Sequence, residues 1–154
     1  MDFQLHLETE TVERAHPAKP ICAAPEDSIR TVLRILQEAK TGAAMVCRDG
    51  KLLGIFTERD ALKLLAQGAD LSAAVSTVMI GNPTTLRAKD TIGTAISLMS
   101  SGGFRRLPIV DSSNKITGVL KVSNILRYLV EQFPKVVYTL PPAPHHKTAE
   151  REGA

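Results

Sequence analysis

The sequence contains no tryptophan, and aromatic residues make up only 4% of its 154 positions. The hydrophobic core must therefore be built from aliphatic side chains and methionine. No apolar run approaches the roughly 18 to 20 residues that cross a bilayer, and the N-terminus lacks the basic and apolar segments of a secretory signal. We therefore expect a soluble, cytoplasmic protein with no membrane partner.

The sequence also lacks a dense block of Lys and Arg with interleaved aromatic residues. Its net charge is +3, but charges of both signs alternate through most of the chain. Charge alone therefore gives little support to nucleic-acid binding.

Catalytic motifs are missing as well. There is no HExxH sequence, no glycine-rich Walker loop and no Ser, His and Asp order typical of hydrolases. The histidines all lie near the ends of the chain, at His6, His16, His145 and His146. We expect that the protein is not an enzyme and that it has no metal site.

Only two cysteines are present, Cys22 and Cys47, and neither has a CxxC partner. Both lie in apolar segments with the composition of strands. We predict that both are reduced, buried and structural, rather than part of a disulfide or a metal site.

What the sequence does contain is a duplication. Asp27 recurs as Asp90, and Gly54 recurs as Gly118 after a one-residue insertion near Ser113. Each copy is too small to bury its apolar face alone, so the two must pack together. Positions that the copies share are explained by packing, and positions that differ are candidates for function.

Both copies predict the same order of elements from their hydrophobic periodicity and turn residues. The first copy predicts strand, helix, strand, strand and helix at 21–23, 29–39, 43–47, 52–56 and 57–68. The second predicts the same elements at 85–86, 92–99, 107–110, 116–120 and 125–133. Asp27 or Ser28 is placed to cap the start of the first helix. The fold class is α/β (α+β-type), with two β-α-β-β-α repeats packed as a pseudo-twofold pair.

We expect an N-terminal arm (1–17), repeat 1 (18–70), a linking helix (71–80) and repeat 2 (81–133). A C-terminal extension with a disordered tail (134–154) follows. Phe3, Leu5 and Leu7 alternate with polar residues, which is a weak strand signal. We expect the arm to add a strand or to help a partner subunit dock. The Pro-rich tail predicts disorder.

Three motifs make this pattern resemble a tandem pair of CBS domains, also called a Bateman module. Gly54 to Asp60 fits the family's Gly-apolar-x-Thr-x-x-Asp motif, and Gly103 to Asp111 resembles its Gly-x-x-Arg-Leu-Pro-Val-Val-Asp strand. Val75 to Met79 resembles the lead-in to a second repeat. The resemblance implies a stand-alone regulatory module that binds AMP, ADP, ATP, NADH or S-adenosylmethionine in the cleft between the repeats. It implies no required cofactor, and it implies a homodimer formed through the apolar helix faces.

By this resemblance, Thr57 would contact phosphate or ribose, and Asp60 would accept hydrogen bonds from the ribose hydroxyls. The same spacing also predicts a helix capping box, and capping does not exclude binding. The segments that would line the adenine include Ile21, Ala23 and Thr85. These short strand residues are also needed for packing.

The second copy departs from the motif, because Lys121 replaces Thr and Asn124 replaces Asp. Lys121 could pair with a phosphate, and Asn124 could still bind a ribose hydroxyl without charge. Arg105 and Arg106 precede the middle strand, where the family often places a phosphate-binding residue, although a solvated strand end explains them too. We expect one well-formed site centred on the first copy and an altered or empty second site.

The alternative function is a scaffold or dimerisation module that has kept the fold and lost its ligand. Lys121 and Asn124 favour this alternative, whereas Thr57 and Asp60 oppose it. A regulated partner protein is also expected, and the sequence does not identify it.

Overall fold

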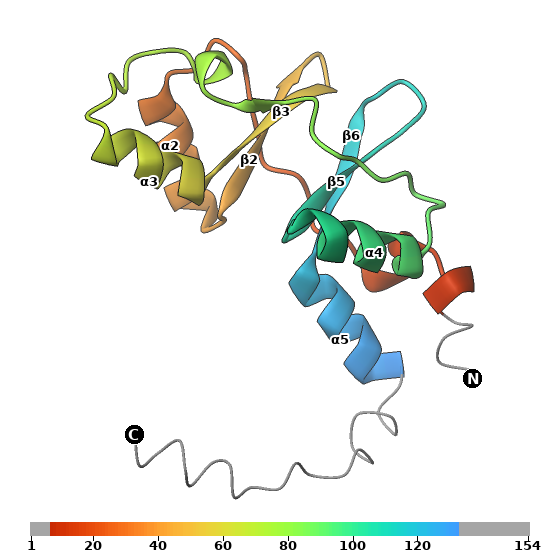
Figure 1. The fold of residues 1–154 in the computed structure, drawn as a ribbon. Helices are drawn as coiled ribbons and strands as arrows, with labels where there is room; N and C mark the ends of the chain where they lie inside the picture. The colour runs from red at the N-terminus through yellow and green to blue at the C-terminus, as the bar shows by residue number, and fades with distance from the viewer. Residues whose placement is uncertain (1–6, 133–154) are drawn as a thin grey trace, which may run out of the picture.

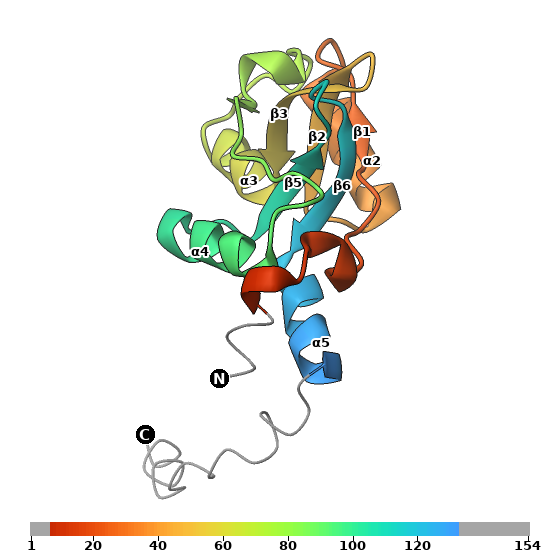
Figure 2. The ribbon, with the colours of Figure 1, turned by 90° about the vertical axis from the view of Figure 1, so that its right-hand side faces the viewer.

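Two antiparallel hairpins, one from each repeat, stand face to face at the centre of the structure (Figures 1 and 2). The computed structural model describes residues 7–132 of the chain. Most of the predicted arm strand and the predicted tail lie outside these residues. Within the described part, no helix is both long and apolar enough to cross a bilayer.

The first repeat has the predicted order of elements, and the second has it except for its short first strand. The first contains β1 (Cys22–Ala23), α2 (Ile29–Ala39), β2 (Ala43–Arg48), β3 (Lys51–Thr57) and α3 (Glu58–Ala66). The second contains α4 (Ile92–Gly102), β5 (Arg106–Val110), β6 (Ile116–Lys121) and α5 (Val122–Gln132). In place of a counterpart to β1, Leu86 forms an isolated parallel bridge with Ile109. The predicted mixed fold of two similar repeats is therefore confirmed.

The first helix of each repeat begins with the same local signal. Ser28 Oγ accepts a hydrogen bond from the Thr31 amide at 3.1 Å, and Thr91 Oγ1 accepts one from the Thr94 amide at 3.0 Å. Of the two predicted caps, Ser28 is the one that caps α2. Asp27 instead accepts the Ala24 amide at 2.9 Å and so holds the turn before the helix.

The segment between the repeats is not the linking helix that we predicted for residues 71–80. It contains one 3-10 turn, η2 (Val75–Thr77), and then the short strand β4 (Ile80–Gly81). Besides the local bonds of this turn, the backbone pairs with the first repeat, since the Val75 amide donates to the Asp27 carbonyl at 2.8 Å. These long-range partners override the helical spacing of the apolar residues.

Strand β4 explains why Gly54 must be small. It pairs antiparallel with β3 in the order β1-β2-β3-β4 and places Gly81 opposite Gly54. A Cβ at Gly54 would lie 2.6 Å from Met79 Sδ and 2.8 Å from the Ile80 carbonyl oxygen. Any side chain at this position would therefore push the linking segment away from the sheet.

The N-terminal arm pairs with the second repeat, as β4 pairs with the first. The Val12 amide donates to the Asp90 carbonyl at 2.9 Å, and Ala18, directly after the arm, exchanges two backbone hydrogen bonds of 2.9 Å with Val119 of β6. The 3-10 turn η1 (Val12–Ala15) places Val12, with no exposed surface, in the second core. Leu7 lies in a helical turn, so the predicted strand does not extend to it.

A shared apolar layer joins the two hairpins. It consists of the buried residues Ala43, Met45, Leu52, Ile55, Val110 and Val119. At the hairpin tips, Asn114 Nδ2 donates to the Leu52 carbonyl at 2.9 Å, and the Leu52 amide donates to the Asn114 carbonyl at 3.0 Å. The two repeats therefore form one unit, and the layer fixes how their strand ends meet.

We predict that Val12→Ala lowers the free energy of unfolding by about 1–3 kcal/mol, because the change leaves a cavity in the second core. Chemical denaturation of the full chain measures this loss. Glu13→Ala is the matched control, since Glu13 is exposed in the same turn and should change stability by less than about 0.5 kcal/mol. Equal effects of the two changes would show that the arm is not part of the core.

Candidate functional site

A hollow of about 170 Å³ opens between the repeats, at the start of β2 and β5 and at the end of β6. We call it the inter-repeat cleft. It is lined by Lys19, Ile21, Ala39, Lys40, Thr41, Ala43, Met45, Arg106, Val119 and Lys121. The lining thus combines an apolar wall with four cationic side chains and contains no carboxylate. Of the predicted site residues, Ile21, Arg106 and Lys121 meet here.

Arg106 reaches from the second repeat to the first. It begins β5 opposite Lys121, yet a Cβ built at Gly42 would lie only 3.1 and 3.2 Å from its Nη1 and Nη2. Its Nε atom is buried and has no hydrogen-bond partner among the described residues. A buried, unsatisfied donor costs about 1–3 kcal/mol, so a hydrogen-bond acceptor that reached this N–H group would be stabilising.

Lys19 and Lys40 also line the cleft, although no sequence signal points to either of them. Lys19 comes shortly before β1, and Lys40 follows α2 in a left-handed conformation with φ of 53°. Neither position belongs to the three motifs that carry the family resemblance. A basic residue at a helix C-terminus is common because it complements the helix dipole, so Lys40 carries no special signal by itself.

Thr57 and Asp60 form the capping box that their spacing predicts. Thr57 Oγ1 accepts the Asp60 amide at 3.3 Å, while Asp60 Oδ2 accepts the Thr57 amide at 3.0 Å and the Thr57 hydroxyl at 2.9 Å. Neither residue lines the inter-repeat cleft. Both bonds to Asp60 end on Oδ2, so Oδ1 accepts no hydrogen bond from a described residue. Capping therefore leaves this carboxylate oxygen free for a ligand.

The second copy keeps half of this arrangement. Asn124 Oδ1 accepts the Lys121 amide at 2.8 Å, as Asp60 does with Thr57. Asn124 is only 5% exposed, and its hydrogen bond stabilises the start of α5. The Lys121 side chain has no oxygen with which to complete the box, and it lines the cleft instead.

The remaining predicted residues do not line the inter-repeat cleft. Arg105 is exposed, Thr85 is half-buried, and Ala23 lies in the first core. Ala23 therefore has the packing role that the sequence also allowed. Among residues 7–132, no group of three or more His, Cys, Asp and Glu side chains is placed to hold a metal ion.

The prediction that both cysteines are buried is wrong. Cys22 is exposed and Cys47 is half-buried, although both belong to strands of apolar composition. The reason is the position of β1, which has only two residues and forms the edge of the four-stranded sheet. A strand this short leaves one of its two side chains uncovered.

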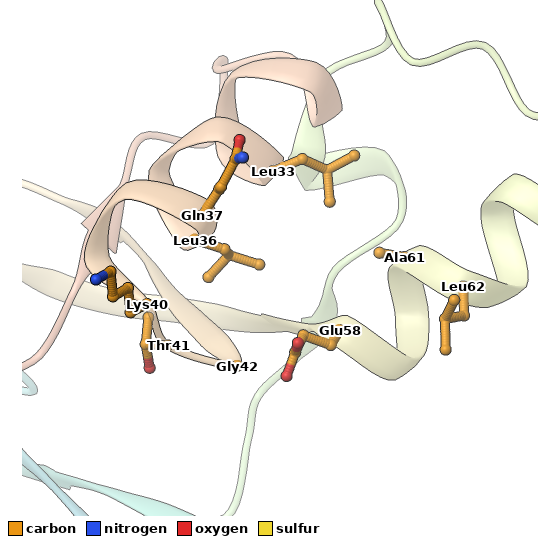
Figure 3. A pocket seen from close by; sticks show the side chains of 9 residues that line it. All are labelled: Leu33, Leu36, Gln37, Lys40, Thr41, Gly42, Glu58, Ala61 and Leu62. Atoms are coloured by element: carbon orange, nitrogen blue, oxygen red, sulfur yellow. The ribbon is translucent and has the colours of Figure 1, made fainter.

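A larger hollow, of about 550 Å³, lies between α2 and α3 (Figure 3). We call it the helix groove. Leu33, Leu36 and Gln37 line it from α2, and Glu58, Ala61 and Leu62 line it from α3. Lys40 and Thr41 border both the helix groove and the inter-repeat cleft, so the two hollows adjoin.

A family model for the CBS domain matches the chain twice, at residues 12–67 and 75–131. The chain belongs to the CBS domain family. A curated relative, the CBS domain-containing protein YhcV of Bacillus subtilis, is 32% identical over 66% of this chain and 73% of its own length. Several other curated relatives are much longer, and the chain spans only 16–38% of their length.

Solved CBS structures share the fold. CBSX2 in complex with AMP is 26% identical, with a TM-score of 0.68 over 79% of this chain and 97% of that chain. The CBS domain pair of protein MJ0100 was solved with 5′-methylthioadenosine and S-adenosylmethionine. It is 25% identical, with a TM-score of 0.72 over 80% of this chain and 98% of that chain. Similar CBS pairs therefore bind adenosine-containing ligands.

We predict that Thr57→Ala lowers the free energy of unfolding by about 1 kcal/mol in the absence of added ligand, because α3 loses its cap. Thermal or chemical denaturation measures the loss. Thr57→Ser keeps the hydroxyl and should retain most of the stability. If the serine variant lost as much as the alanine variant, the Oγ1 hydrogen bond would not be the cause.

Proposed function

We propose that this CBS pair is a regulatory, non-catalytic module that binds an adenine nucleotide between its repeats. The observation that carries the proposal is the lining of the inter-repeat cleft, where four cations surround an apolar wall. Related CBS pairs with bound AMP or S-adenosylmethionine support the adenosine part of the ligand. A cytoplasmic location suits such a sensor and belongs to the same proposal.

The cations favour a ligand that carries phosphate. Arg106 offers a planar guanidinium with an unsatisfied Nε–H, and Lys121 adds a point charge from the neighbouring strand end. S-adenosylmethionine carries a positive sulfonium, and methylthioadenosine carries no phosphate. Among the expected ligands, AMP, ADP, ATP and NADH therefore suit this cleft better than S-adenosylmethionine.

The sugar and base have candidate partners on the first repeat. Asp60 Oδ1 remains available for a ribose hydroxyl, as the family resemblance implies. Ile21 and Ala43 give the cleft an apolar wall that suits a purine face. The cleft alone is smaller than the roughly 300–1,000 Å³ typical of small-molecule sites, so a nucleotide also needs the adjoining space near Thr41.

Ligand binding would act on the contact between the repeats. Lys19 and Lys40 come from the first repeat, whereas Arg106 and Lys121 come from the second. Like charges that face one another across a contact repel, and an anionic ligand relieves the repulsion. A ligand shifts a conformational equilibrium only by binding one form better than another, and a phosphate would favour arrangements in which the cations of the two repeats lie close together.

We predict that ATP or AMP at about 100 times its dissociation constant stabilises the protein by about 2.7 kcal/mol in a thermal-shift experiment. Arg106→Met should weaken this binding at least about tenfold, which corresponds to about 1.4 kcal/mol. Arg105→Met is the matched control, because Arg105 is exposed and outside the cleft. If no adenosine ligand stabilised the wild-type chain, the scaffold function would replace this proposal.

The helices also expose apolar side chains that suit a second copy of the chain. Leu62 and Leu65 on α3 are 68% and 54% exposed, and Leu126 and Val130 on α5 are 56% and 45% exposed. Leu62 and Leu126 occupy equivalent places in the two repeats. A surface repeated in this way can pair with itself around a twofold axis, so we include a homodimer in the proposal.

We predict that the double variant Leu62→Glu, Leu126→Glu is monomeric, because like charges would meet in the apolar contact. Sedimentation equilibrium or light scattering measures the mass. Leu53→Glu is the control, since Leu53 is 36% exposed on β3 and away from these helices. A wild-type chain that is already monomeric at high concentration would contradict the dimer.

A further inference from the structure

The two cysteines lie side by side on neighbouring strands. Cys22 is in β1 and Cys47 is in β2, and their Sγ atoms are 3.8 Å apart. Cys22 is exposed, so small molecules in solution can reach the pair. Cys47 packs against the edge of the shared apolar layer, and neither thiol lines the inter-repeat cleft.

The strand register explains why the thiols meet. β1 runs parallel to β2 with Cys22 opposite Met45, and side chains at 45 and 47 project from the same face of a strand. Cys22 and Cys47 are therefore diagonal neighbours on one face. A disulfide needs the sulfur atoms to approach to about 2.05 Å. β1 is a two-residue edge strand, so a small movement of one short segment can close this gap.

The chemistry of the two thiols differs in a way that suits oxidation. Cys47 donates its S–H to Cys22, and this hydrogen bond lowers the pKa of Cys22 to about 7 despite partial burial. The same hydrogen bond, with burial and the charge of Cys22, raises the pKa of Cys47. An accessible thiolate beside a second thiol is the usual arrangement in redox-sensitive sites.

One ion pair lies next to the cysteines. Arg48 Nη2 lies 2.5 Å from Glu26 Oε2, and this ion pair joins the same two segments just beyond the cysteines. Both side chains are more than half exposed, so the pair adds little stability by itself. It does hold the two segments together at the end where the thiols lie.

We propose that Cys22 and Cys47 form a reversible disulfide when the protein meets a hydroperoxide. The Cys22 thiol loses its proton, the thiolate attacks one oxygen of hydrogen peroxide, and the O–O bond breaks. Cys22 becomes a sulfenic acid, and the other oxygen leaves as hydroxide, which takes up the released proton to give the first water. Cys47 sulfur then attacks the Cys22 sulfur, its proton combines with the departing hydroxide, and water is released. Two thiols are oxidised and one peroxide is reduced to two waters. A dithiol reductant returns both thiols.

This inference does not depend on nucleotide binding. It does place a covalent restraint beside the inter-repeat cleft, because the Met45 amide donates to the Ile21 carbonyl at 2.7 Å and both residues line the cleft. The disulfide would tie β1, and the segment with Ile21, to the sheet. The site is thus a modification site next to the candidate ligand site.

The test uses the full chain, reduced and then treated with equimolar hydrogen peroxide near neutral pH. Samples are quenched with an alkylating reagent, and intact mass and peptide mapping follow the products. We expect the monomer to lose two hydrogens, to resist alkylation at both cysteines and to regain both thiols with dithiothreitol. Cross-linking should be at least about tenfold faster in the folded chain than in urea, because folding holds the sulfurs together.

Cys22→Ser and Cys47→Ser complete the experiment. Cys22→Ser should leave Cys47 slow to react, whereas Cys47→Ser should trap oxygen on Cys22 or give a disulfide between two chains. The proposal is overturned if the wild-type monomer gains oxygen without cross-linking. It is also overturned if both cysteines stay open to alkylation, or if cross-linking is no faster in the folded chain.

Discussion

The apolar layer between the two hairpins is the contact on which the rest of the structure depends. Neither repeat is large enough to bury its sheet alone, and the layer that includes Met45, Ile55 and Val119 covers both. This packing aligns the ends of β2, β5 and β6, and therefore decides which polar residues meet at the edge. The inter-repeat cleft is a consequence of that alignment, because its apolar wall continues the same layer outward through Ala43 and Val119.

The cleft shows how the duplicated halves have become unequal. The second repeat supplies Arg106 at the start of its middle strand, whereas the first repeat has the small residues Gly42 and Ala43 in the corresponding place. A Cβ at Gly42 would meet Glu58 Oε1 as well as the Arg106 guanidinium, so the absence of a side chain here makes room for both groups. Two equivalent arginines would crowd and repel each other in this space. The position of the Arg106 guanidinium therefore depends on the difference between the copies.

Sequence periodicity predicted nearly all helices and strands because each copy must present an apolar face to the same layer. It failed where long-range backbone pairing decides the structure: residues 71–80 pair with the first repeat, and Ala18, directly after the arm, pairs with β6. Within the site, motifs indicated Arg106 and Lys121 but gave no sign of Lys19, which only the fold brings to the cleft. The exposure of Cys22 likewise follows from the edge position of β1, which composition does not reveal.

The Thr-x-x-Asp motif separates into a folding part and a functional part when the copies are compared. In both repeats the side chain at the third helical position accepts the amide that precedes the helix, from Thr57 to Asp60 and from Lys121 to Asn124. Since this bond persists where the hydroxyl and the charge are gone, it is the part required for folding. In the first repeat the Thr57 hydroxyl adds a second capping bond, because it accepts the Asp60 amide. The carboxylate charge is therefore the feature of the motif that capping does not require.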